Sequence, residues 1–271
     1  MYKIRDARIS VQLYSLRDHL GDLDVTLAHL ADIGVEAIEP FWIMDGPDEL
    51  AAVFTRHGLA APTVQSPFLS DEIVFDGHAV PLPPAESMFD AAARLGARIV
   101  FDPMVAPDRW RTPETIRHTA DRLNQAADLA TTFGLSVGYH NHSFEFHHSI
   151  DGVSGYEYFV SLLDPRVVLE LDVFWAAVAN QDVAALVGRL DGRVRALHLK
   201  DGFPGVDPFE SGASYVASTL DQCPLGDGAI DIAGILEATP SCEFDIVEFD
   251  HVDTDVFAAI AASIQFLQRS R

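Results

Sequence analysis

The chain has 271 residues, 48% of them hydrophobic, which is enough for one large single domain. Its 18 basic and 41 acidic residues give a formal net charge of −23, which excludes nucleic acid and anionic membranes as favourable partners. The chain shows neither a signal-peptide pattern nor a run approaching the roughly 20 apolar residues of a spanning helix. We therefore expect a cytoplasmic protein in which Cys223 and Cys242 are reduced thiols.

Short apolar, β-branched runs recur along the whole chain and alternate with helical patterns. This alternation predicts repeated βα units around a parallel sheet. The eight runs that we interpret as strands are Ile9–Ser15, Val35–Phe41, Ala60–Ser66, Ala97–Pro103, Leu135–His142, Val167–Val173, Val194–Asp201 and Phe244–Asp250.

The intervening segments carry apolar residues three and four apart, which is typical of helices that cover a sheet. The clearest are Asp24–Gly34, Glu86–Ala97, Pro113–Gly134 and Asp182–Gly192. A glycine follows the last turn at five such positions, where a left-handed cap would end the helix: Gly34, Gly58, Gly96, Gly134 and Gly192.

Eight such units predict an α/β protein, a (β/α)8 TIM barrel that forms a single domain over residues 1–271. An open doubly wound sheet is the structural alternative. Two irregular stretches, Ala79–Ser87 and Gly202–Leu225, are expected to be loops over one barrel face.

Reactive side chains gather at the ends of the predicted strands, which surround one mouth in a barrel. In chain order they are Gln12, Tyr14, Glu39, Gln65, Asp102, His140, Asn141, His142, Glu145, Glu170, Asp172, His198, Lys200, Asp201, Glu248 and Asp250. Residues two apart on a strand share a face, and charged pairs avoid the outer face because helices bury it. Converging carboxylates and imidazoles indicate one divalent ion, such as Mn, Zn, Mg or Co.

Several of these residues also have structural interpretations. Glu170 lies one layer deeper than Asp172 and suits a buried acid behind the site. Lys200 either pairs with Glu170 or contacts substrate, and Glu39 either bonds a neighbouring strand or contacts substrate. The two histidines beyond the fifth strand, His147 and His148, are interpreted as solvated loop residues.

The order of motifs resembles the sugar-phosphate isomerase/epimerase family of the xylose isomerase-like TIM-barrel superfamily. The motifs are VQLYSLRD, LADIGVEAIEPF, GYHNHSFEF, LELDVFWAAVA, VRALHLKDG, PLGDGAIDIAGIL and IVEFD. The resemblance implies a metal held from strands five to eight, with Asp172, His198 and Glu248 as the last three ligands. At the fifth strand His140 stands where many epimerases have a glutamate, as in a Tyr-His-Asn-His subgroup. Either His140 is the fourth ligand, or Glu145 reaches back from the loop.

Such a site predicts proton transfer beside a carbonyl, giving isomerisation or epimerisation of a keto-sugar or related polyol through an enediolate. Glu248, Glu145 or His142 would move the proton. The side chains expected to orient hydroxyls and exclude water are Gln12, Glu39, Trp175 and Lys200.

Three alternatives remain at the sequence level. A lyase or dehydratase, similar to inosose dehydratase, would use an imidazole as the acid for the leaving group. Phosphodiester hydrolysis, as in the endonuclease IV branch, conflicts with the charge of −23. A barrel that only binds sugar is the third. The expected partner is a small sugar-like molecule, and pairing of barrel helices in a homo-oligomer is compatible with the sequence.

Overall fold

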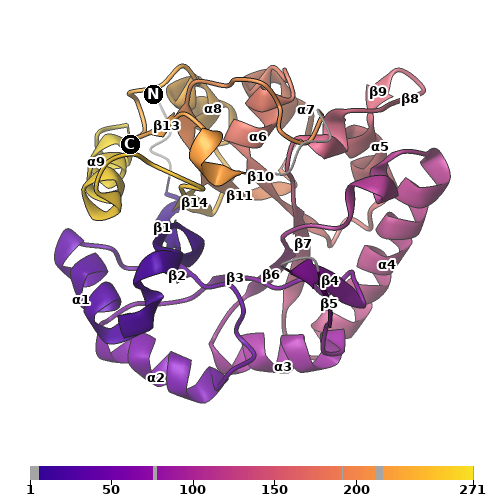
Figure 1. The fold of residues 1–271 in the computed structure, drawn as a ribbon. Coiled ribbons are helices and arrows are strands. Elements are labelled where there is room, and N and C mark those ends of the chain that lie inside the picture. The colour runs from indigo at the N-terminus through magenta and orange to yellow at the C-terminus, as the bar shows by residue number, and fades with distance from the viewer. Residues whose placement is uncertain (1–5, 76–77, 191, 211–215, 271) are drawn as a thin grey trace.

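A computed structural model describes residues 6–75, 78–190, 192–210 and 216–270 of the chain. Eight parallel strands form a ring, and helices surround it (Figure 1). The strand order is β2-β1-β14-β11-β10-β7-β6-β3, and isolated bridges from Ala37 to Ala60 and from Phe41 to Gln65 join the two ends. The protein is therefore the predicted (β/α)8 barrel.

The barrel strands coincide with the eight predicted runs, although each is shorter. Their bounds are β1 (Arg8–Gln12), β2 (Ile38–Glu39), β3 (Thr63–Gln65), β6 (Ile99–Asp102), β7 (Ser136–His140), β10 (Val168–Asp172), β11 (Val194–Leu199) and β14 (Phe244–Val247). Three small antiparallel ladders lie in the connections: β4 (Glu72–Phe75) with β5 (His78–Pro81), β8 (Ser149–Ile150) with β9 (Val153–Ser154), and β12 (Asp201–Gly202) with β13 (Gln222–Cys223).

The described helices are α1 (Leu23–Ile33), α2 (Pro47–Arg56), α3 (Ala85–Arg94), α4 (Pro113–Thr131), α5 (Gly155–Leu162), α6 (Val173–Val178), α7 (Val183–Leu190), α8 (Ile232–Ala238) and α9 (Val256–Arg269). Short 3-10 turns are η1 (Leu13–Asp22), η2 (Pro107–Trp110), η3 (Phe144–Phe146) and η4 (Ala217–Thr219). The predicted left-handed glycines have positive φ, from 64° to 92°. At Gly34 the cap N–H bonds the last turn of α1, so the chain can reverse toward β2.

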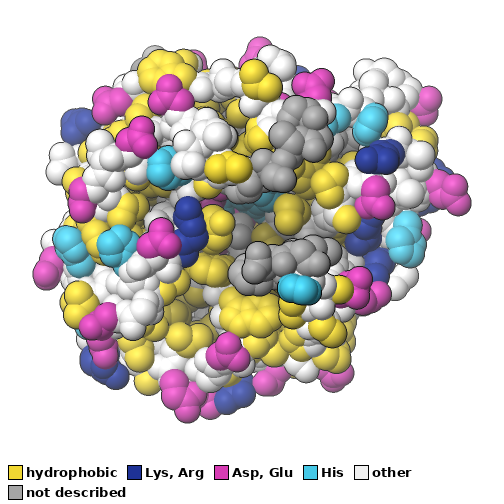
Figure 2. Space-filling model, viewed as in Figure 1, with side chains coloured by type: hydrophobic (Ala, Val, Ile, Leu, Met, Phe, Trp, Pro, Cys, Tyr) yellow, Lys and Arg dark blue, Asp and Glu magenta, His cyan; other side chains and the backbone are white. Residues whose placement is uncertain are grey.

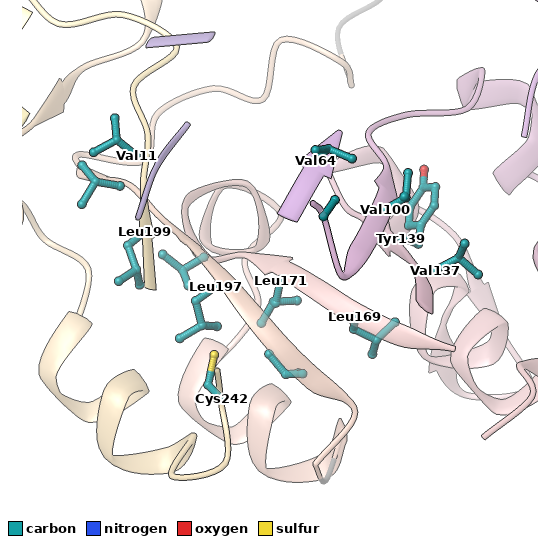
Figure 3. Close-up of a cluster of buried hydrophobic side chains, with 14 of the residues drawn as sticks. Val11, Val64, Val100, Val137, Tyr139, Leu169, Leu171, Leu197, Leu199 and Cys242 are labelled. Atoms are coloured by element: carbon teal, nitrogen blue, oxygen red, sulfur yellow. The ribbon is translucent and has the colours of Figure 1, made fainter. Parts of the chain in front are cut away.

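Alternation along each strand separates an apolar outer layer from a polar inner one. On β10, Leu169 and Leu171 join the large core between strands and helices, whereas Glu170 and Asp172 face the barrel axis. Figure 3 shows the outer layer, including Leu169, Leu171 and Tyr139. The inner side chains can therefore be polar without breaking the core.

The barrel interior opposite the mouth is apolar. A separate buried cluster fills it with Ile99, Phe101, Ala196, Phe244 and Ile246. Gly138 leaves room for the ring of Phe101, since a Cβ there would lie 2.6 Å from the ring and 2.5 Å from a backbone oxygen. This apolar floor confines the polar groups to the other end of the barrel.

Two details of the predicted loops differ. The prediction that Ala79–Ser87 is a loop is wrong at both ends of the stretch. Its first residues belong to β5, and its last residues begin α3. In the described part of Gly202–Leu225 there is a 3-10 turn and short strand pairing but no α-helix; residues 211–215 lie outside the described residues. Among the helices of the described ranges, none has the length and apolar character needed to cross a bilayer.

Candidate metal centre and active site

His198, at the end of β11, is the centre of the polar cluster. Its Nδ1 lies 2.5 Å from Glu248 Oε2, and its Nε2 lies 2.7 Å from Glu39 Oε1 and 3.2 Å from Glu170 Oε2. All four side chains are buried. The ring therefore divides the cluster into an outer part beside Glu248 and a deeper part beside Glu39 and Glu170.

His140 and Asp172 complete the outer part. His140 Nε2 lies 3.8 Å from Asp172 Oδ2, and His140 Nδ1 lies 3.1 Å from Glu170 Oε2. Asp172 Oδ1 caps α6 by accepting from the N–H of Trp175 at 2.9 Å, while Oδ2 is buried without a hydrogen bond. Asn141 bonds the backbone of Asp172 on both sides and fixes the neighbouring strand ends.

Lys200 neutralises part of this negative charge. Its ammonium lies 3.0 Å from Asp172 Oδ2 and 2.8 Å from both Glu248 Oε2 and Asp250 Oδ2. Of the two alternatives for Lys200, the ion pair with Glu170 does not form, because strand register puts Glu170 opposite Ala196, deeper than Lys200; substrate binding by Lys200 stays a prediction. With three carboxylates around it, the ammonium is a fixed part of the cluster.

The buried charges perturb one another strongly. Although burial opposes their charge, the surrounding carboxylates raise the pKa of His198 and of Lys200 well above their usual values. Burial, opposed by Lys200, raises the pKa of Asp172 to about 6. Burial and the neighbouring Glu39 raise the pKa of Glu170 to about 8. The cluster therefore holds more negative charge than its protein cations balance, which favours a bound cation or retained protons.

Gln12 and Glu39 lie behind His198 rather than at the open mouth. Gln12 Nε2 donates to Glu39 Oε1 at 2.8 Å, and both side chains are inaccessible to solvent. On the other side Gln65 Nε2 donates to Glu170 Oε2 at 2.9 Å. These contacts orient the carboxylates that hold His198, and substrate binding by Gln12 and Glu39 stays a prediction.

Glu145 lies on the helix side of β7. Its Oε1 accepts from the hydroxyl of Tyr139 at 2.9 Å and its Oε2 from the N–H of His142 at 2.9 Å. Tyr139 belongs to the outer core, so this carboxylate points away from the barrel axis. Burial raises the pKa of Glu145 to about 8. Of the two proposed fifth-strand ligands, the structure brings His140 to the cluster and leaves Glu145 out.

His142 borders the mouth within a group of rings. Its ring stacks on Phe144 at 5.6 Å between centroids and lies 5.7 Å from Trp175 and 5.8 Å from Phe209. Its Nδ1 is buried without a hydrogen-bond partner, and burial lowers the pKa of His142 to about 4. Trp175 is fully buried and forms part of this wall. Sequence reasoning missed Phe209, because nothing local marks a loop phenylalanine as a contact of β7 and α6.

His147, interpreted from the sequence as a solvated loop residue, is only partly exposed in the structure and pairs with Asp207. Its Nε2 lies 2.8 Å from Asp207 Oδ2, and Asp207 Oδ1 accepts from Ser143 Oγ at 2.9 Å. The neighbouring His148 is exposed, as predicted. The pair ties the connection after β11 to the connection after β7.

Asp201 anchors the loop that follows β13. Its carboxylate accepts four backbone N–H groups, from Gly202 at 2.8 Å, Gly226 at 2.8 Å, Gly228 at 3.1 Å and Ile230 at 3.2 Å. Asp201 is therefore saturated by backbone donors and has a structural role beside Lys200.

The residues present suit a divalent cation. His140, Asp172 and His198 offer ligand atoms within 4.8 Å of one another, and so do Glu39, Glu170 and His198. Imidazole nitrogens and carboxylate oxygens are ligands for Zn and Mn, and buried oxygens of Asp172, Glu39 and Glu170 have no hydrogen bond. Glu248 stands outside both groups but contacts His198 directly.

Residues 27–239 match the family described as the xylose isomerase-like TIM barrel. A search of curated proteins finds no match. Solved structures show the same fold at identities too low to transfer a reaction. A sugar phosphate isomerase/epimerase from Parabacteroides distasonis is 20% identical with a TM-score of 0.76, over 99% of this chain and 96% of that chain.

Two further structures are similar over nearly their whole length. The probable 3-DHS dehydratase AsbF from Bacillus anthracis is 12% identical, with a TM-score of 0.70, over 96% of this chain and 98% of that chain. The IolI protein, solved with a zinc atom, is 17% identical, with a TM-score of 0.72, over 97% of each chain. Because the matched family segment covers most of its length, the chain belongs to the xylose isomerase-like TIM-barrel family.

Proposed function

We propose that the protein is a divalent-metal-dependent isomerase or epimerase of a keto-sugar or related polyol. The observation that carries the proposal is the buried group of His140, Asp172 and His198 at the barrel mouth, whose ligand atoms lie within 4.8 Å of one another. Similarity to a sugar phosphate isomerase/epimerase and to a zinc-holding barrel supports this assignment.

We propose His140, Asp172, His198 and Glu248 as the residues that hold the ion. Such an ion would act as a Lewis acid on a carbonyl and its neighbouring hydroxyl. Glu39 and Glu170 fix the orientation of the His198 ring from behind, because both contact its Nε2. The ligands would thus be held in place before substrate arrives.

Glu248 and His142 are the proposed proton-transfer groups. Glu248 is kept ionised because Lys200 and His198 lower its pKa despite burial. His142 presents an Nδ1 without a partner and is mainly neutral near pH 7, since burial and then Lys200 lower its pKa to about 4. Glu248 follows β14 and His142 follows β7, and β11 and β10 separate these two strands in the barrel, so we place the substrate between the two groups. Two such groups permit epimerisation, whereas one permits isomerisation.

The test is solvent exchange. The protein is incubated with Mn and a panel of keto-sugars in deuterated water, and recovered sugar is analysed by NMR and mass spectrometry. We expect deuterium at the carbon beside the carbonyl, together with an isomer or epimer. The absence of exchange from the whole panel, with a metal-loaded protein, would refute the proposal.

A metal-dependent lyase of a keto-sugar or keto-inositol is the second candidate. It is favoured by the adjacent rings of His140 and His142, 5.2 Å apart, since an imidazole can supply the acid for a leaving group. Similarity to a probable dehydratase adds support. An unsaturated product in the same assay, instead of exchanged substrate, would identify this reaction.

A further inference from the structure

One side of the mouth is apolar and aromatic, directly beside the proposed ligands. Phe209 lies 5.2 Å from the ring of Phe144 and 5.4 Å from that of Trp175, in addition to its contact with His142. Trp175 is joined to Asp172 through the helix cap, and Lys200 Nζ lies 5.9 Å from its ring. These four rings, His142, Phe144, Trp175 and Phe209, are called the aromatic wall.

The connection after β12 brings Phe209 to this wall and keeps it there. Asp207, 6% exposed, accepts from Ser143 and from the N–H of Phe209 and pairs with His147. The same connection carries Phe203, 51% exposed, and Val206, 88% exposed. A chain segment that presents apolar side chains to solvent while buried polar contacts hold it against β7 is suited to meeting an apolar group.

Exposed apolar side chains also lie at two other places on this barrel end. Trp42, which follows β2, is 42% exposed, and Met104, which follows β6, is 44% exposed. In Figure 2 many hydrophobic side chains are visible toward the centre of this end, and most acidic side chains lie toward the periphery. A sugar alone would leave much of this surface in contact with water.

The charges of the site disfavour a phosphate. The Lys200 ammonium lies within 3.0 Å of three buried carboxylates, those of Asp172, Glu248 and Asp250, and two more buried carboxylates, Glu39 and Glu170, lie deeper beside His198. A bound divalent ion would offset two of these negative charges, and the carboxylates would still surround the Lys200 ammonium. The guanidinium of Arg17, near the rim in the described structure, lies 4.5 Å over the ring of Tyr14 and donates to two backbone oxygens. Neither cation is directed to bind an anion.

We propose that the substrate is uncharged and carries an apolar, aromatic substituent on its sugar-like part, and that Phe209 determines this specificity. The inference rests on the proposed sugar chemistry and adds the substrate class. The polar part meets the outer cluster beside Asp172 and His140, while the substituent packs on Phe209 and His142, the two partly exposed rings of the aromatic wall, which the buried Trp175 and Phe144 support from behind. Asp207 acts as a positioning residue, since it reaches the substituent only through Phe209.

The test compares three probes by calorimetry on the Mn-loaded protein: methyl β-D-glucoside, phenyl β-D-glucoside and glucose 6-phosphate. We expect the phenyl glucoside to bind about tenfold more tightly than the methyl glucoside, because edge-to-face ring contacts add to apolar burial. Glucose 6-phosphate should bind more weakly than either. Equal binding of the two glucosides, no binding of either, or a preference for the phosphate would overturn the proposal.

The variant Phe209→Ala should lose the phenyl preference, measured as the ratio of its own affinities for the phenyl and methyl glucosides. Phe209→Leu, which keeps apolar volume without a ring, should give an intermediate preference. This variant tests the role of Phe209 if the alanine variant does not fold. Val153→Ala, at an exposed apolar position on the β8–β9 hairpin, is the matched control and should keep the full preference. An undiminished preference in both Phe209 variants would overturn the role of Phe209.

Failure of this inference and failure of the proposed function are distinguishable. A protein that exchanges hydrogen on unsubstituted or phosphorylated keto-sugars, but does not prefer the phenyl probe, retains the proposed function and lacks the specificity. A protein that prefers the phenyl probe and exchanges nothing retains the specificity and lacks the chemistry.

Discussion

Replacing Asp201 by Asn should destabilise the loop that carries the PLGDGAIDIAGIL motif without changing the metal ligands. In the structure each carboxylate oxygen accepts two N–H groups: Oδ1 from Gly202 and Ile230, and Oδ2 from Gly226 and Gly228. An amide keeps one oxygen, so its NH2 group would face two backbone donors. Leaving two partly buried donors unsatisfied, and losing charge assistance on the others, costs about 2–4 kcal/mol.

For a chain of this size, that cost corresponds to a fall in the thermal midpoint of about 5–15 °C. The assay is thermal unfolding followed by circular dichroism, with Mn affinity measured in parallel. Asp231→Asn is the matched control, because Asp231 is an exposed helix cap and Asn caps helices equally well. A midpoint for Asp201→Asn within 2 °C of the control would refute the reasoning that this carboxylate holds the loop.

Three further predictions concern other contacts. Glu145→Ala should cost about 1–3 kcal/mol in urea unfolding, because it leaves the N–H of His142 and the hydroxyl of Tyr139 without their acceptor; Mn affinity should stay within twofold, and a large loss of Mn affinity would indicate that Glu145 belongs to the metal site. Although burial opposes it, the hydrogen bond from His147 holds the pKa of Asp207 below its usual value. Stability from this depressed pKa is present above the unfolded value and lost as pH falls, so hydrogen exchange in residues 203–209 should accelerate below about pH 4, and Asp207→Asn should abolish that step. Gly138→Ala should destabilise the protein by about 1–3 kcal/mol in the same unfolding assay, because its Cβ would lie 2.5 Å from a backbone oxygen; an unchanged midpoint would contradict this packing.

The fold could be predicted from sequence because the two-residue alternation of strands and the three- to four-residue repeat of helices can both be recognised within short segments. The alternation of Leu169, Glu170, Leu171 and Asp172 assigns alternate residues to the core and to the axis. Register then follows from neighbouring strands, and it explains why Lys200 does not pair with Glu170. Asp172 is paired with His198, so a side chain two residues further along β11 meets Asp172 and not Glu170.

The parts of the site that depend on loops could not be predicted. Glu145 follows β7 by a few residues, and the η3 turn directs it to Tyr139 on the helix side, which no strand period specifies. His147 meets Asp207 from a connection 60 residues away. Phe209 reaches Trp175 by the same connection. Contacts between loops depend on their relative paths over the barrel, and composition alone does not define those paths.

The most direct test of the proposed metal centre is an anomalous difference map from crystals of the protein grown with Mn. We predict one strong peak per chain, bonded by His140, Asp172 and His198, with Glu248 completing the set. Occupancy should vanish in Asp172→Ala and persist in His148→Ala, which changes an exposed histidine beyond the site. A peak confined to Glu39 and Glu170, or no peak at the barrel mouth, would contradict the proposed centre.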